Sequence, residues 1–322
     1  MTVRDFEAIS RPLRLSAVPL MLVAGLLVAG QSEINGRLAA ELGVGPRAGI
    51  GAALISFGSG LALLVVLTLV QPRHRAGVRH LVAAVRDERL PVPHLLGGLC
   101  GAFLVASQGL TVPTIGVALF IVAVTAGQTT SSLLVDHHGL GPSGPQALSR
   151  PRLVAAVFAV VAVLIATGER LHTSVSLQVA LLAALPLLAG AGIAVQQAFN
   201  GRVSHQVGPW ITTLNNFAVG TAGLFLAFLG SLLLPGQLQA LPTTWWLYVG
   251  GAMGVAFIWL AALLVKVHGV LVLGLAVIAG QVVGSQAIEL ATTAHIGPLG
   301  VLAGALTIVG VLVALLLRGV RG

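Results

Sequence analysis

Stretches of about twenty apolar residues recur along this chain, and they limit its fold more than any other feature. A helix needs about that length to cross the roughly 30 Å hydrocarbon core of a bilayer. Residues 114–135 and 209–233, for example, contain no Asp, Glu, Lys or Arg. Charged residues make up only 8 % of the 322 positions and hydrophobic residues 57 %, whereas soluble domains carry roughly 25 % charged residues. The chain is therefore predicted to be an all-α membrane protein.

The polar breaks between the apolar stretches predict ten transmembrane helices, five in each half. The expected spans are 17–40, 47–70, 94–112, 114–135, 151–168, 178–199, 209–233, 244–265, 269–290 and 297–317. An odd number of spans in each half makes the second half enter the membrane from the opposite side. We therefore expect residues 1–170 and 171–322 to form two inverted five-helix repeats, an arrangement found in many transporters.

The basic residues give an independent view of topology, because cytoplasmic segments of membrane proteins are enriched in Arg and Lys. If the N-terminus is cytoplasmic, only Arg37, Arg47 and Arg170 fall on the outer side. The other fourteen are cytoplasmic: Arg4, Arg11, Arg14, Arg73, Arg75, Arg79, Arg86, Arg89, Arg150, Arg152, Arg202, Lys266, Arg318 and Arg321. This division supports ten spans with both termini cytoplasmic.

The basic segment 71–93 is the longest polar insert, and it has two interpretations. Leu81, Val82 and Val85 would share one face of a helix, with arginines elsewhere, so the segment could be an amphipathic helix lying on anionic headgroups. It could equally be a solvated basic loop. Neither interpretation makes it the site of chemistry.

A polar motif occurs twice, in "GQSEINGRLAAELG" and in "QQAFNGRVSHQVG". Gln31, Asn35, Gly36 and Arg37 lie 165 positions before Gln196, Asn200, Gly201 and Arg202. A second set lies 153 positions before its copy: Gly97, Gly98, Gly101, Gly116, Gly127 and Gln128 match Gly250, Gly251, Gly254, Gly269, Gly280 and Gln281. The two halves are therefore duplicates, and the second has lost about a dozen residues, mostly from the basic insert.

The segments "QSEINGRLAAELGVGP", "ALISFGSG" and "AGQTTSSLLVDHHGLGP" resemble the YdcZ-type inner-membrane exporters of the drug/metabolite transporter superfamily. The resemblance covers essentially the whole chain, twice. It implies the drug/metabolite transporter fold and a secondary transporter that exports a small metabolite or drug-like molecule. Family members with one copy have about five helices and pair as antiparallel dimers, so the resemblance implies a monomer that works as a fused dimer. Glu33 and the two histidines after Asp136 depart from the family pattern.

Several function classes have no support in the sequence. There is no Walker motif, nucleophile triad or dinucleotide fingerprint, so we expect no enzyme activity and no cofactor. The arginines do not form a basic face with interleaved aromatics, so the net charge of +8 indicates topology and not nucleic-acid binding. Cys100 is the only cysteine, which excludes an internal disulfide. The expected partners are a small-molecule substrate, the lipid bilayer and protons.

Glu33 is the charged residue that most invites a functional interpretation, because charges inside a membrane are costly and usually functional. It lies in the first predicted span, while the matching residue in the second copy is Ala198. A carboxylate facing a cavity could couple transport to protons. However, Arg37 follows at i+4, the spacing of an ion pair on one helix face, so a structural pair is the other interpretation.

The amides within predicted spans are the remaining site candidates. Gln31 and Asn35, like Gln196 and Asn200, share a helix face, and they fit either a cavity wall or a C-terminal cap with the following Gly in the left-handed region. The Gln that follows Gly in the fourth and ninth spans, Gln128 and Gln281, fits interhelical hydrogen bonds beside closely packed glycines. The other candidates for the lining of a cavity are Gln108, Asn215 and Asn216.

Asp136, His137 and His138 are unsuited to a metal site, because three adjacent ligands cannot converge on one ion from a helix end. We interpret them as a solvated cytoplasmic helix end. The alternative to transport is a lipid-handling or scaffold protein. A ligand-sized cavity lined by the paired amides and Glu33 would favour transport, whereas a sealed, wholly apolar core would favour the alternative.

Overall fold

The computed structural model describes residues 11–141, 144–145 and 177–293, together with single positions at 153, 154, 157, 158, 161, 298, 301, 302, 304–306, 308 and 309. The expected spans 151–168 and 297–317 fall largely outside the described residues. The described part is helical apart from turns, loops and one two-residue strand pair. The prediction of an all-α protein is therefore confirmed.

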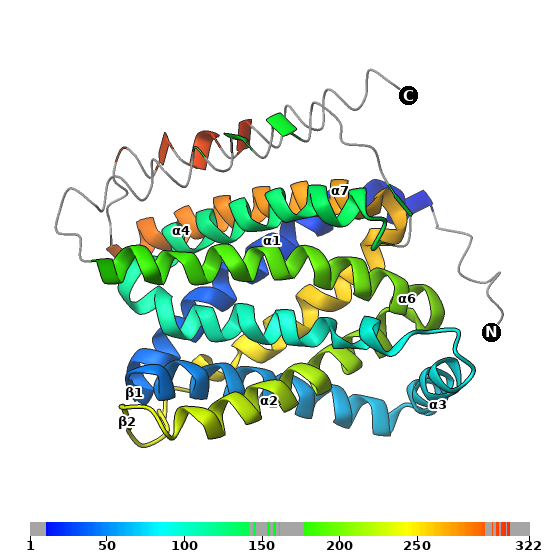
Figure 1. Ribbon diagram of the computed structural model, residues 1–322, viewed down its shortest axis with the longest axis horizontal. Coiled ribbons are helices and arrows are strands. Elements are labelled where there is room, and N and C mark those ends of the chain that lie inside the picture. The colour runs from blue at the N-terminus through cyan, green and yellow to red at the C-terminus, as the bar shows by residue number, and fades with distance from the viewer. Residues whose placement is uncertain are drawn as a thin grey trace.

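The helices follow one another along the chain as shown in Figure 1. They are α1 (Arg11–Leu42), α2 (Pro46–Val70), α3 (Pro72–Arg86), the 3-10 turn η2 (Val92–Leu96), α4 (Gly97–His137), α6 (Leu177–Ser231), the 3-10 turn η3 (Trp245–Tyr248) and α7 (Gly250–Thr293). The antiparallel strands β1 (Gly43–Val44) and β2 (Gln237–Leu238) join the loop after α1 to the loop after α6.

Each of the helices α4 and α6 contains a break at a glycine. Gly116 in α4 has φ 75° and ψ 162°, and Gly208 in α6 has φ 82° and ψ 166°. Glycine tolerates this positive φ, whereas other residues rarely adopt it. Pro209 follows the break in α6 and lacks the backbone N–H that would continue the helix. Figure 1 shows α4 and α6 doubling back, so each covers two of the expected spans.

Among the described residues, four helical segments are long and apolar enough to cross a membrane: 46–70, 92–137, 184–231 and 245–264. The second and third have 46 and 48 residues, which is more than twice the roughly 20 residues needed to span. Both contain one of the glycine breaks. The chain is thus a membrane protein, while the arrangement of ten spans as inverted repeats stays a prediction.

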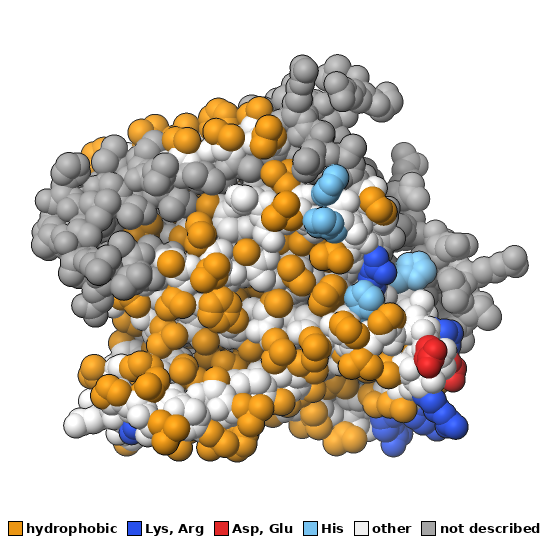
Figure 2. Space-filling view, viewed as in Figure 1, with side chains coloured by type: hydrophobic (Ala, Val, Ile, Leu, Met, Phe, Trp, Pro, Cys, Tyr) orange, Lys and Arg blue, Asp and Glu red, His pale blue; other side chains and the backbone are white. Residues whose placement is uncertain are grey.

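Charged side chains gather at one end of the molecule. Figure 2 shows most of the basic and histidine side chains at the end that carries α3, whereas hydrophobic side chains cover the surface between the ends. Arg47 lies at the opposite end, where it donates hydrogen bonds to the carbonyls of Leu232 and Leu234 at 3.0 and 2.9 Å. This distribution agrees with the positive-inside division expected from the sequence.

The basic insert folds as a helix, so the solvated-loop interpretation is wrong for residues 72–86. Ala84 is fully buried in α3 and packs with Val203 of α6. The ring of His74 stacks on the ring of Trp210 with their centroids 4.3 Å apart. One face of α3 therefore covers α6, and the arginines lie on the rest of its surface.

The two halves exchange matching contacts. Gly25 of α1 lies directly against the backbone of Val277 in α7, and Gly190 of α6 lies directly against the backbone of Val124 in α4. Gly25 and Gly190 are 165 positions apart, and Val124 and Val277 are 153 apart, which are the two offsets of the duplicated motifs. The first helix of each half thus packs on the opposite half at equivalent positions.

Two phenylalanines meet between α2 and α6. The rings of Phe57 and Phe217 are stacked with their centroids 4.7 Å apart, and both side chains are buried. Gly60 lies against Phe217, and Gly220 lies against Phe57. Gly60 follows Phe57 by one helical turn, and Gly220 follows Phe217 by one turn. Each ring therefore packs on the glycine of the opposite helix, so this contact is also reciprocal.

Candidate functional site

A closed cluster of hydrogen-bonded polar side chains lies in the first half, between α1 and α4. Asn35 Nδ2 donates to Gln108 Oε1 at 2.7 Å, and Gln108 Nε2 donates to Ser32 Oγ at 2.9 Å. Ser32 in turn donates to the carbonyl of Val28 at 2.7 Å. Gln108, Ser32 and Asn35 are fully buried. The Gln108 amide therefore uses both its oxygen and its nitrogen inside the core.

Gln31 connects this cluster to the other half. Its Nε2 donates to the backbone carbonyl of Gly250, the first residue of α7, at 3.0 Å. The side chain is 4 % exposed. Asn35 Oδ1 is also buried, and it has no hydrogen-bond partner. The first duplicated motif thus lies at the contact between the halves.

The second half has a matching cluster with different partners. Asn216 Nδ2 donates to Asn200 Oδ1 at 3.0 Å, and Gln196 Nε2 donates to Asn216 Oδ1 at 3.0 Å. Asn216 therefore bridges the two amides of the duplicated motif. The first half has Ser56 at the position that corresponds to Asn216, since each immediately precedes one ring of the stacked phenylalanine pair.

Two amide atoms of adjacent residues on α6 are buried without a hydrogen-bond partner. They are Gln196 Oε1, an acceptor, and Gln197 Nε2, a donor. Gln196 is 1 % exposed and Gln197 is 8 % exposed. A buried amide without a hydrogen bond costs free energy, so these groups are available to a ligand or to water. Both lie on α6.

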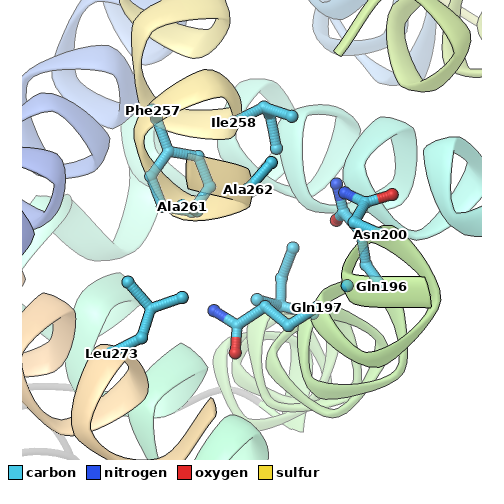
Figure 3. Close-up of a pocket in the computed structure, with 10 residues that line it drawn as sticks. Gln196, Gln197, Asn200, Phe257, Ile258, Ala261, Ala262 and Leu273 are labelled. Carbon is cyan, nitrogen blue, oxygen red and sulfur yellow. The ribbon is translucent and has the colours of Figure 1, made fainter. Parts of the chain in front are cut away.

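A small cavity adjoins these amides. Figure 3 shows it between α6 and α7, with the Gln197 side chain extending toward Leu273 and the amides of Gln196 and Asn200 on one side. The other lining residues are Ile193, Gly201, Phe257, Ile258, Ala261 and Ala262. Its volume is about 10 Å³, which is enough for about one water. The protein is therefore closed around this site in the present conformation.

The two halves differ at this site by an exchange of side chains. The offsets of the repeats pair Gln108 with Ala261 and Ser32 with Gln197. The large amide thus comes from α4 in the first half and from α6 in the second. In the first half both its oxygen and its nitrogen form hydrogen bonds, whereas in the second its nitrogen has no partner. Sequence analysis identified Gln108 but missed Gln197, which is visible only when the repeats are compared position by position.

The capping interpretation of the Asn-Gly pairs is wrong. α1 continues past Gly36 to Leu42, and α6 continues past Gly201 to the break at Gly208. The segment 200–208, which separates the expected spans 178–199 and 209–233, is thus helical up to the break at Gly208. Asn35 and Asn200 are buried and bonded to other side chains. Gly36 instead gives room to Val112, whose side chain lies against it.

Glu33 forms an ion pair with Arg37. The distance from Arg37 Nε to Glu33 Oε1 is 2.6 Å, and the side chains are 44 % and 21 % exposed for Arg37 and Glu33 respectively. The Arg37 guanidinium also lies over the Trp246 ring, 5.8 Å from its centroid. Glu33 points away from the buried amides, because residues two positions apart do not share a helix face. The ion-pair interpretation therefore describes the geometry.

Gln128 and Gln281 lie where the two halves pack most closely. Gly127 lies directly against the backbone of Leu187, and Gly280 lies directly against that of Leu22, which confirms the close packing expected beside these glutamines. However, both Nε2 and Oε1 of Gln128 are buried without a hydrogen-bond partner. The expected interhelical hydrogen bond is therefore wrong for Gln128.

The remaining candidates lie near the α3 end. Asn215 Nδ2 donates to the backbone carbonyl of Leu95 at 2.9 Å, so it anchors η2 and does not line the cavity. Asp136 is 9 % exposed, which corrects the expectation of a solvated helix end, although His137 and His138 are exposed. No group of three or more potential metal ligands occurs among the described residues.

Both halves of the chain match the same known protein family. The model of the family described as "Putative inner membrane exporter, YdcZ" matches residues 16–165 and again residues 181–316. The chain belongs to the YdcZ family. The two matches correspond to the two halves, as expected for a two-copy form. The family's description supports a transporter in the inner membrane.

A solved crystal structure of another protein has a similar fold. It matches with a TM-score of 0.63 at 18 % sequence identity, covering 97 % of this chain and 100 % of that one. At this identity the similarity concerns the fold alone. The search of curated proteins found no match.

Proposed function

We propose that this YdcZ-family protein is a secondary transporter that exports a small metabolite or drug-like molecule across the inner membrane. The observation that carries the proposal is the pair of unpartnered amide groups beside the cavity in the second half, Gln196 Oε1 and Gln197 Nε2. One accepts and the other donates a hydrogen bond, and the surrounding wall is mainly apolar. A substrate with an apolar body and a group that both donates and accepts fits this lining.

Transport requires the site to open in turn to each side of the membrane. The cavity of about 10 Å³ is far smaller than the roughly 300 Å³ of typical ligand sites. The structure therefore corresponds to a closed state, and the substrate site forms when α6 and α7 separate. Binding then supplies hydrogen bonds that the closed protein lacks, which favours the open, occupied state.

An inverted repeat explains the reciprocal contacts. When two equivalent units meet across a twofold axis, residue i of one contacts residue j of the other, and j contacts i. Gly25 with Val277, and Gly190 with Val124, fit this rule. The stacked pair of Phe57 and Phe217 fits a position on the axis. We therefore propose ten spans as two inverted five-helix repeats in one fused dimer, with both termini cytoplasmic.

Single-cysteine labelling tests this topology. In a Cys100→Ala background, Arg75→Cys and Leu238→Cys place thiols in α3 and β2, at opposite ends of the molecule. In intact cells we expect a membrane-impermeant maleimide to label position 238 and to label position 75 only after the cells are opened. Labelling at 75 but not at 238 in intact cells would contradict the proposal.

The substrate site is tested by filling the cavity. Ala261→Gln places in α7 the amide that Gln108 provides in α4, so that the new side chain occupies the cavity. We expect it to lower export in proteoliposomes by about tenfold or more, because a loss of about 1.4 kcal/mol in substrate binding already corresponds to a factor of ten. A panel of labelled metabolites and drugs gives the substrate, with and without a pH gradient. Ala252→Gln, at an exposed position of the same helix, is the matched control. Wild-type export rates in Ala261→Gln would disprove the site.

The non-transport alternative, a lipid-handling or scaffold protein, predicted a sealed, wholly apolar core. The described core instead buries Gln, Asn, Ser and Thr side chains in both halves. A proton was the coupling ion suggested by Glu33. Because Glu33 is paired with Arg37 and points away from the amides, the proposed transport mechanism assigns no coupling ion.

A further inference from the structure

A second cavity lies near the α3 end, outside the proposed substrate site. It has a volume of about 300 Å³, which is in the range of small-molecule sites. Its walls come from the segment before α4, the loop after α4 and the middle of α6. The lining residues are Arg89, Leu90, Pro91, His94, Gly141, Gly144, Arg202, His205 and Gln206. We call it the Arg202 cavity.

The lining of the Arg202 cavity is rich in cationic and hydrogen-bond-donating side chains. It contains two arginines, two histidines and one glutamine, and no Asp or Glu among its described lining residues. Arg89 is already paired, since its Nη2 lies 3.0 Å from Asp87 Oδ2. Arg202 has no such neutralising partner in the described part of the chain. Its charge therefore remains the main electrostatic feature of the cavity.

Arg202 is held in place by neutral groups. Its Nε donates to the carbonyl of Leu140 at 2.7 Å, and its Nη2 donates to the carbonyl of Gly139 at 2.7 Å. These two bonds fix the guanidinium beside the end of α4. A guanidinium has five N–H donors, so three remain for another acceptor. The two bonds that anchor the loop after α4 therefore leave N–H donors of Arg202 available to a ligand.

His94 lines the cavity from η2. Its ring packs edge-on against Phe199, with the ring centroids 5.1 Å apart. This aromatic contact fixes the orientation of the ring. Side chains of η2 and α6 thus both line the cavity.

We propose that the Arg202 cavity binds an anion that bears a phosphate group. Phosphate oxygens accept several charge-assisted hydrogen bonds from different directions, and Arg presents donors in a planar fork that matches them. The donor side chains around this cavity come from two separate segments, 89–94 and 202–206, so they can approach one phosphate group from different sides. The phosphate could belong to a soluble ester or to a lipid headgroup. This site does not depend on the proposed transport activity.

Binding of inorganic phosphate to the purified full-length protein tests the proposal. The protein is studied in maltoside micelles, which contain no phosphate, by isothermal titration calorimetry against a chloride control of equal ionic strength. We expect saturable phosphate binding that Arg202→Gln weakens by about tenfold or more. Arg75→Gln, an exposed arginine of α3 that does not line the cavity, should leave binding unchanged.

A second arm separates the two sources of phosphate. Native mass spectrometry counts retained phosphatidylglycerol in the wild type and in Arg202→Gln. Loss of retained lipid in the variant assigns the site to headgroups, whereas phosphate binding without lipid retention assigns it to a soluble anion. Because Arg202→Gln could loosen the loop after α4, Arg89→Gln, which breaks no backbone bond, is tested in parallel and should weaken binding about threefold. The proposal is overturned if the wild type binds neither ligand, or if Arg202→Gln and Arg89→Gln both bind like Arg75→Gln.

Discussion

The two halves of this protein share their packing but not their polar interior. Backbone contacts at glycines are reciprocal, as Gly25 and Gly190 show. The buried amides differ, because the oxygen and the nitrogen of Gln108 both form hydrogen bonds in the first half, while the nitrogen of Gln197 has no partner in the second. A duplicated fold can thus keep its framework symmetric while equivalent positions inside it have different hydrogen-bond partners. Unpaired buried groups cost stability, and functional sites commonly bear such costs.

The replacement of Gln108 by Ala261 and of Ser32 by Gln197 does not simply leave more room for a ligand in the second half. Gln108 and Phe120 are replaced by the smaller Ala261 and Leu273, but the neighbouring Leu104 is replaced by the larger Phe257. The side-chain volume is therefore redistributed among positions of α7 that line the cavity. A pair of residues that exchange roles between the repeats changes which groups are satisfied and leaves the helix packing intact.

Removal of the large amide from each half should have unequal effects. Gln108→Ala leaves a cavity and deprives both Asn35 and Ser32 of a partner, so we expect a loss of about 3 kcal/mol in unfolding free energy. Gln197→Ala removes a group that has an unpartnered donor, and it should cost about 1 kcal/mol or less. Thermal unfolding in detergent measures both. Equal losses would show that the second half is as tightly bonded as the first.

The reciprocal glycines should instead respond equally. Gly25→Ala and Gly190→Ala each place a methyl group against the backbone of the opposite half, which cannot move cheaply, so each should cost about 2 kcal/mol. Gly58→Ala is the control, because nothing lies near the position of its added methyl group, and alanine favours helix. Unequal losses at Gly25 and Gly190 would break the proposed symmetry.

The fold could be predicted from the sequence to the extent that it depends on local composition. Apolar length predicts helices, and the expected boundary at 47–70 agrees with α2 at Pro46–Val70. The breaks at Gly116 and Gly208 could be placed only approximately, because many other glycines in the chain lie within regular helix. The sequence did not predict the pairing of β1 with β2, since two residues carry no alternating pattern.

The site was predictable in part for a different reason. The duplicated motif identified Gln31, Asn35, Gln196 and Asn200 as important, and all four are buried at the contact of the helices. Their partners depend on which helix lies opposite, which is tertiary information. Gln128 shows this limit, because the sequence favoured an interhelical hydrogen bond and its amide has none.

The bridging residue offers a third test of the comparison. Asn216→Ala removes the hydrogen bonds to both Gln196 and Asn200, and we expect a loss of about 1.5 kcal/mol. Ser56→Ala, at the corresponding position of the first half, should cost less than about 0.5 kcal/mol, because Ser56 Oγ has no hydrogen-bond partner. Chemical or thermal unfolding of the two variants in the same detergent decides the matter. A larger loss of unfolding free energy for Ser56→Ala than for Asn216→Ala would contradict the role of Asn216 as the bridging residue.

The smallest expected effect concerns Glu33, which has no acidic counterpart because Ala198 occupies the matching position. Its ion pair with Arg37 is partly exposed, and such pairs contribute about 0.5 kcal/mol or less. Glu33→Gln should therefore leave stability nearly unchanged. It should also leave export unchanged in proteoliposomes, with and without a pH gradient, because the carboxylate points away from the buried amides. Arg37→Ala should likewise cost little. If Glu33→Gln abolished only the export driven by a pH gradient, Glu33 would be the coupling residue. The first half would then provide proton coupling, and the second half would provide the substrate site.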